Sequence, residues 1–166
     1  MISHITTPYA HHVKAQVQRR TVIDYFNLLP WLGIGYPATS SEKRQLLQVE
    51  NHPIIDLRHD YLLVHPDASP SEQITVFRAR HKTDLLAVSL PDYHSDYNDF
   101  TLYRLHYGKL QDVTRQMLPM PVDTNHFLYE LPRFNTTIRV FRFDLNTQLR
   151  HHVFDLKWRS GHFVRV

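Results

Sequence analysis

Residues 74–90 read ITVFRARHKTDLLAVSL, and this stretch decides the fold class. Two mainly apolar runs, Ile74 to Arg80 and Leu85 to Leu90, flank the polar sequence HKTD. Apolar runs of this length on both sides of a polar turn are typical of a β-hairpin. The sequence therefore predicts two antiparallel strands here.

The same arrangement of two runs and a short turn recurs after Asn51. The other predicted hairpins pair residues 54–58 with 61–65, 100–107 with 110–116, 137–144 with 148–156, and Trp158 with 162–166. The last one turns at Ser160-Gly161, a pair suited to a two-residue turn. Because a large open sheet tends to curl, we expect one curved or half-closed antiparallel β-meander of about eight to ten strands.

Two short helices are expected before the strands. Between Thr21 and Leu29 apolar residues recur at i, i+3, i+4 and i+7, the spacing of an amphipathic helix, and Pro30 ends it. A second helix is expected from Thr39, because Thr39 and Glu42 match the capping box. The predicted fold class is α+β, mainly β, with two short N-terminal helices followed by the meander.

Length and composition indicate one domain. The 166 residues are 42% apolar and 21% charged, which suits a packed core and argues against disorder. We expect a tail or edge segment over residues 1–20 and a single α+β domain over 21–166. No apolar run approaches the roughly 18 to 20 residues of a membrane helix, so no membrane span is expected. The first twenty residues lack a signal-peptide core. A periplasmic or otherwise exported location is expected if a leader was removed, and a cytoplasmic one otherwise.

Several function classes are excluded or disfavoured by composition. The absence of cysteine excludes disulfides, thiol nucleophiles and zinc–cysteine sites. No glycine-rich phosphate or dinucleotide motif occurs, and we expect no cofactor. A net charge of +3 is too mild for a dedicated nucleic-acid-binding protein, so nucleic acid is not the expected partner. The thirteen histidines would make the chain more cationic near pH 6.

The most acidic stretch is a candidate metal site. Asp92, Asp96, Asn98 and Asp99 offer the hard oxygen ligands that calcium prefers. Their spacing does not match an EF-hand, and the stretch has no glycine for its sharp turn. The alternative is a solvated connection, in which aspartates favour turns.

Arginine and aromatic side chains alternate along several predicted strands. Arg78, Arg80, Arg104 and Arg142 are candidates for holding a polyanion, with neighbouring aromatic rings as stacking partners. An ordinary half-buried sheet has the same pattern, because arginine stems cover apolar surface.

Residues 31–37, WLGIGYP, form an apolar segment between the two predicted helices. Such a segment either folds over one end of the sheet or presents Trp31 and Tyr36 to a partner. The partner expected is a protein or a cell-envelope component.

The sequence contains no recognised catalytic motif: the G-x-S-x-G elbow is absent, and we expect no S-x-x-K motif at the start of a helix. The favoured function is therefore a non-catalytic binding or envelope-associated protein of bacterial origin. One alternative is a hydrolase whose carboxylates come from separate strands, with Glu130 as a candidate. A polyanion- or nucleic-acid-binding sheet is the other.

A resemblance to other proteins rests on five stretches of the sequence: 25–30, 54–64, 76–88, 100–119 and 129–140. Over residues 21–166 the chain resembles uncharacterised bacterial proteins, often exported, in which helices precede a β-meander. The resemblance implies this layout and an envelope location. It implies no activity, ligand or site residue.

Overall fold

Antiparallel strands are the main secondary structure in the computed structural model, as the sequence predicts. The structure describes residues 19–32, 36–67, 71–79, 83–91, 99–120, 127–144, 146–147 and 149–166. All five predicted hairpins are confirmed by antiparallel pairing. The Ser160-Gly161 turn has positive φ at both residues, 48° and 90°, as a tight hairpin turn requires.

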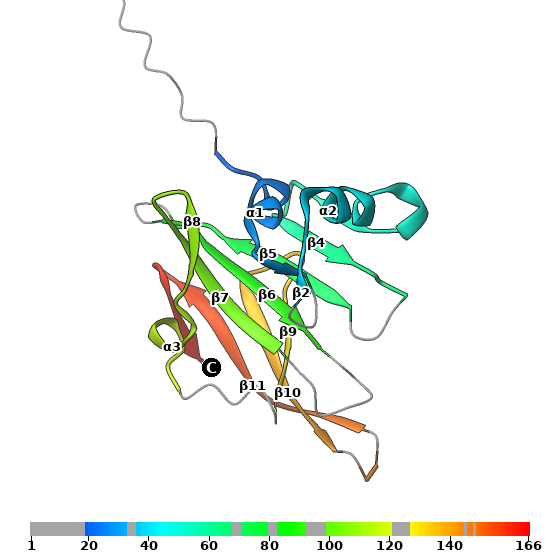
Figure 1. Ribbon diagram of the computed structural model, residues 1–166. Coiled ribbons are helices and arrows are strands. Elements are labelled where there is room, and N and C mark those ends of the chain that lie inside the picture. Colours follow the sequence, from blue (N-terminus) through cyan, green and yellow to red (C-terminus); the bar gives the residue numbers. More distant parts are fainter. Residues whose placement is uncertain are drawn as a thin grey trace, which may run out of the picture.

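The larger sheet has six strands that follow one another in sequence (Figure 1). They are β3 (Ile54–Asp56), β4 (Tyr61–Val64), β5 (Glu72–Phe77), β6 (Leu85–Leu90), β7 (Asp99–His106) and β8 (Lys109–Asp112). The smaller sheet has four strands in the order β12-β11-β10-β9. Their bounds are β9 (Phe127–Glu130), β10 (Thr137–Asp144), β11 (Leu149–Arg159) and β12 (His162–Arg165). A β-bulge interrupts the pairing of β10 with β11 between Val140 and Phe141.

The expectation of one continuous curved or half-closed sheet is wrong, because the strands divide into these two sheets. The physical reason lies in β5 and β6, whose residues are buried on both faces. A strand that is buried on both faces needs a covering layer on each side. The four-stranded sheet covers one face, and the N-terminal segment covers the other.

Two hydrophobic cores result from this arrangement. Between the sheets, side chains such as Phe77, Leu102, Phe154, Leu156 and Trp158 pack together. On the opposite face of the larger sheet, α1 (Val22–Leu28) packs its buried side on β4, β5 and β6. The second core is made of Val22, Tyr25, Phe26, Leu29, Leu62, Val64, Ile74, Val76, Leu86, Val88 and Leu90.

Buried polar side chains join the two sheets. Ser89 and Thr75 donate to the carbonyl oxygens of Tyr129 and Pro132, at 2.5 and 3.1 Å. Gln73 accepts from the backbone N–H of Leu131 at 2.8 Å. These bonds satisfy polar groups inside the interface and fix the position of the segment that follows β9.

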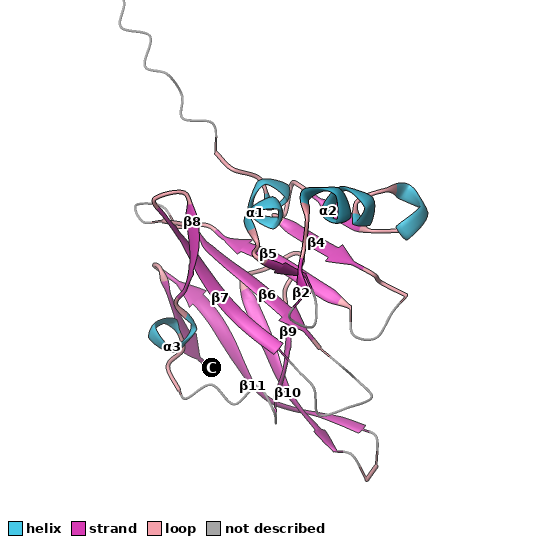
Figure 2. Ribbon diagram, viewed as in Figure 1, coloured by secondary structure: helices cyan, strands magenta, loops and turns pink. Residues whose placement is uncertain are grey.

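The N-terminal segment contains α1, the two-stranded ribbon of β1 (Trp31–Leu32) and β2 (Tyr36–Pro37), and α2 (Ser40–Leu46). Figure 2 shows α1 and α2 together over the larger sheet near β4 and β5. Capping boxes begin both helices, with Thr21 and Asp24 at α1 and Thr39 and Glu42 at α2.

A 3-10 helix (Val49–Asn51) follows α2, and α3 (Thr114–Met117) follows β8. Among the described residues, no helix is long and apolar enough to cross a membrane.

Candidate binding pocket beside Trp31

A pocket of about 300 Å³ opens on the helix-covered face of the larger sheet. It lies where the end of α1 and the start of β1 pass over β5, β6 and β7. The described residues that line it are Leu29, Trp31, Glu72, Val88, Leu90, Asp99, Thr101 and Tyr103.

Strand register brings the lining residues of the sheet together. Asp99 lies opposite Leu90, and Thr101 lies opposite Val88. Alternate residues of a strand share one face, so Asp99, Thr101 and Tyr103 all project from the same side of β7. The helices cover β4, β5 and β6, and the β7 end of this face remains as the wall of the pocket.

Two aromatic side chains contribute to the pocket. Trp31 is 49% exposed, and its strand pairs with β2 through the partners Trp31 and Pro37. Tyr103 is half-buried, and burial raises its pKa above the ordinary value. A hydrogen bond with Thr101 opposes this increase, and the nearby charges of Asp99, Asp112 and Glu72 add to it.

The charged side chains that line the described part of the pocket are both acidic. Asp99 is exposed at the start of β7, whereas Glu72 is only 4% exposed. Lys43 lies within electrostatic range of Glu72: burial lowers the pKa of Lys43, and the Glu72 charge opposes that change. The pocket is thus locally acidic on a chain of net charge +3.

Lys43 has a structural task that the sequence did not reveal. Its ammonium donates to the carbonyl oxygens of Asn27 (3.0 Å) and Leu29, the unpaired acceptors at the end of α1. Ser40 and Lys43 stand in the first turn of α2, so the expectation of no S-x-x-K at a helix start is wrong. Because the ammonium is bonded to α1, it serves as a helix cap, and the spacing alone does not make a catalytic pair.

The pocket combines two residues that the sequence assigned to different sites. Trp31 is a candidate partner contact, and Asp99 is a candidate calcium ligand. The side chain of Tyr36 and the residues Asp92, Asp96 and Asn98 lie outside the described part of the chain. Within that part, no group of three or more potential ligands is placed to hold a metal ion. The calcium site stays a prediction.

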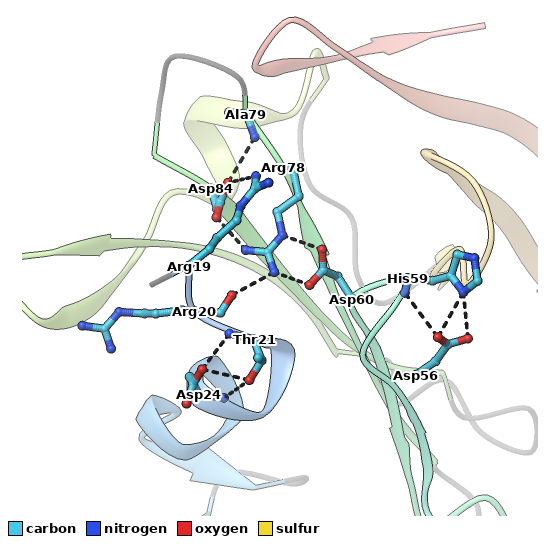
Figure 3. Close-up of polar contacts among 10 residues, drawn as sticks. All are labelled: Arg19, Arg20, Thr21, Asp24, Asp56, His59, Asp60, Arg78, Ala79 and Asp84. Atoms are coloured by element: carbon cyan, nitrogen blue, oxygen red, sulfur yellow. Dashed lines mark hydrogen bonds and ion pairs between the residues drawn. The ribbon is translucent and has the colours of Figure 1, made fainter. Parts of the chain in front are cut away.

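The candidate polyanion residues lie apart from one another. Figure 3 shows Arg78 donating to both oxygens of Asp60 and, at 2.7 Å, to Asp84. It also donates to the Arg20 carbonyl oxygen at 2.8 Å, and Arg19 contacts Asp84 at 3.2 Å.

The other two described candidates are on different strands. Arg104 lies half-buried on β7, with one nitrogen 3.5 Å from the Gly161 carbonyl oxygen, while Arg142 is exposed on β10 of the smaller sheet. Arg80 lies outside the described residues. Polyanion binding by these four therefore stays a prediction.

Sequence reasoning missed Glu72 and Tyr103 as pocket residues. Glu72 precedes the apolar run that predicts its strand, and the pattern shows Tyr103 only as one of the aromatic residues that alternate with arginine. The two-residue period of a strand was the available signal. It places Glu72 on the same face of β5 as Ile74 and Val76, and that face is buried.

No protein-family model, curated protein or solved structure matches the chain in the three comparisons made. The resemblance to exported bacterial proteins therefore remains a prediction, and function has to be inferred from the site itself.

Proposed function

We propose that this protein is a non-catalytic binding protein whose Trp31 pocket takes a cationic group carried by a partner molecule. The group is an ammonium or guanidinium, such as a lysine or arginine side chain of another protein. The observation that carries the proposal is one pocket with two aromatic rings, Trp31 and Tyr103, and two carboxylates, Glu72 and Asp99.

The chemistry of this lining favours a cation over other ligands. A cation near an aromatic face gains about 0.5–1 kcal/mol at exposed sites and about 2 kcal/mol when desolvated, and tryptophan is the best such ring. The carboxylates attract a cation through Coulomb forces, and they repel a polyanion from the same pocket. Apolar Leu29, Val88 and Leu90 suit the methylene stem that carries the charge.

A partner with accessible lysine or arginine fits both kinds of partner expected from the sequence, a protein or an envelope component. An envelope location accompanies the proposal, as an expectation that a localisation experiment on the native protein would check.

A carboxylate hydrolase is the second candidate. Glu72 and Asp99 come from separate strands, β5 and β7, and line one pocket together with Leu90 of β6. An inverting glycosidase likewise uses two carboxyl groups that stand apart with room for a water between them.

The deciding experiment titrates the full chain with choline, N-acetyl-lysine methylamide and N-acetyl-arginine methylamide, followed by NMR. N-acetyl-norleucine methylamide is the uncharged control. We expect saturable binding of at least one cation, weaker at high salt, and no binding of the control. Trp31→Ala should weaken binding by about fivefold or more, and Trp31→Phe should retain part of it.

Asp99→Asn should also weaken binding, whereas Phe134→Ala, an exposed aromatic on another face, should not. Absence of binding by all three cations would refute the proposal. The hydrolase is tested by incubating the protein with neutral oligosaccharides and separating the mixture by chromatography. A hydrolase should form shorter products, and the Glu72→Gln variant should form none.

A further inference from the structure

A second concave surface has a lining that shares no described residue with the Trp31 pocket. It is a groove of about 500 Å³ beside the segment that links β9 to β10, residues 131–136. Its lining residues are Tyr61, Glu130, Leu131, Pro132, Arg133, Phe134, Asn135, Thr137, Arg139 and Asp155. All of them belong to the described part of the chain.

The floor of the groove is a cross-strand row of charges on the outer face of the smaller sheet. Arg139 on β10 lies opposite Glu130 on β9 and opposite Asp155 on β11. It donates to Glu130 at 2.7 Å, and Arg150 approaches the other Glu130 oxygen at 3.5 Å. His152 contacts Asp155 at 2.7 Å.

The rim of the groove is held by an ion pair across the two sheets. Arg133 donates through Nε to Asp56 of β3 at 2.9 Å, and His59 lies 3.0 Å from both oxygens of Asp56. Figure 3 shows the Asp56–His59 contact. The hydrogen bond from Arg133, with those from His59, lowers the pKa of Asp56 to about 2, although desolvation opposes this.

This rim presents an aromatic ring to solvent. Phe134 is 70% exposed. The Arg133 guanidinium lies 4.9 Å from its ring centroid, and the His59 ring meets it edge-on at 5.2 Å. The ring is therefore supported in place with part of its surface open.

The charges of the groove balance, yet hydrogen-bonding groups remain. Two guanidinium groups (Arg133 and Arg139) and two carboxylates (Glu130 and Asp155) line the groove. The adjoining Arg150 and Asp56, which pair with Glu130 and Arg133, add one charge of each sign. Among the described residues, Arg133 donates only through Nε and Arg139 only through one terminal nitrogen. A guanidinium has five N–H donors, so most of them are available to a ligand.

Asn135 adds a further donor. Its side-chain oxygen accepts from the Thr137 N–H at 2.8 Å, so its NH2 group supplies the donors.

From this combination we infer that the groove binds an uncharged, hydroxyl-rich ligand, a neutral oligosaccharide. A sugar hydroxyl is both donor and acceptor, so it matches guanidinium and carboxylate groups placed side by side. The apolar C–H face of a sugar ring covers an exposed aromatic ring such as Phe134. Balanced charge gives neither a polyanion nor a cation a net electrostatic gain.

The test is isothermal titration of the full chain with cellohexaose, maltohexaose, chitohexaose (N-acetylated) and mannohexaose. We expect saturable binding of at least one of them, with an affinity that does not change between low and high salt. Phe134→Ala should weaken it by about fivefold to tenfold, through loss of the stacking surface. Arg139→Met, which keeps much of the stem and removes the donors, should also weaken it.

Trp31→Ala is the matched control and should leave oligosaccharide affinity unchanged, because Trp31 belongs to the other pocket. Circular dichroism of each variant checks that it folds. Absence of binding by all four sugars, binding unaffected by both groove variants, or stronger binding of heparin that weakens with salt would each overturn the inference. Since the cation titration depends on Trp31 and not on Phe134, failure of one proposal leaves the other standing.

Discussion

Two arginine–carboxylate networks on this chain have similar composition and opposite settings. Arg78 is 21% exposed and contacts Asp60 and Asp84, which are 19% and 13% exposed. Arg139 is 56% exposed and contacts Glu130 in the groove. The first network connects the β3–β4 turn, the β5–β6 hairpin and the chain just before α1, whereas the second covers one face of a sheet.

The difference shows that burial, and not residue type, separates an arginine committed to the fold from one exposed to solvent. A partly buried guanidinium with several acceptors has its donors committed to the fold, and losing it leaves carboxylates unpaired. An exposed pair contributes little stability because water competes for both partners. This contrast predicts that substitutions in the two networks and at the groove rim lower the stability of the protein by different amounts.

The largest effect is expected for Arg78→Ala. It leaves Asp60 and Asp84 without their main counter-charge, and the free energy of unfolding should fall by about 3 kcal/mol. Denaturant unfolding followed by circular dichroism measures it. Arg78→Lys should recover only part of the loss, since lysine cannot make the paired contact with Asp60. A loss as small as that of Arg139→Ala would remove the distinction between the two networks.

An intermediate effect concerns acid stability through Asp56. Its pKa is about 2 in the folded protein against an ordinary 3.8. Because the folded pKa is the lower one, the stabilisation is present above about pH 4 and is lost as the pH falls toward 2. Asp56→Asn should therefore flatten the decrease in unfolding free energy across this window. Asp67→Asn, at a carboxylate that is 87% exposed, controls for the removal of one charge, and identical profiles would contradict the prediction.

The smallest effect is expected for Arg139→Ala. Its exposed ion pair with Glu130 should contribute about 0.2–1 kcal/mol, so denaturation midpoints should change only slightly. A destabilisation comparable to that of Arg78→Ala would show that the groove arginine is structural, and would weaken the case for a ligand there.

The strands and caps could be predicted from the sequence because their causes are local. Alternation of apolar residues around polar turns places the hairpins, and each pairing of neighbouring strands follows from a short turn. The capping box predicted at Thr39 and Glu42 likewise depends on residues three positions apart, and the structure adds a second one at Thr21 and Asp24. The sequence also showed that no cysteine chemistry exists here.

Only the tertiary structure decided how the strands divide into two sheets and which residues meet. Arg133 contacts Asp56 across 77 positions of sequence, and Ser89 contacts Tyr129 across 40. Trp31 and Asp99 line one pocket because α1 packs on β5 and β6. Such contacts depend on how whole layers pack to cover both faces of buried strands, and this is a property of the complete chain that no local period contains.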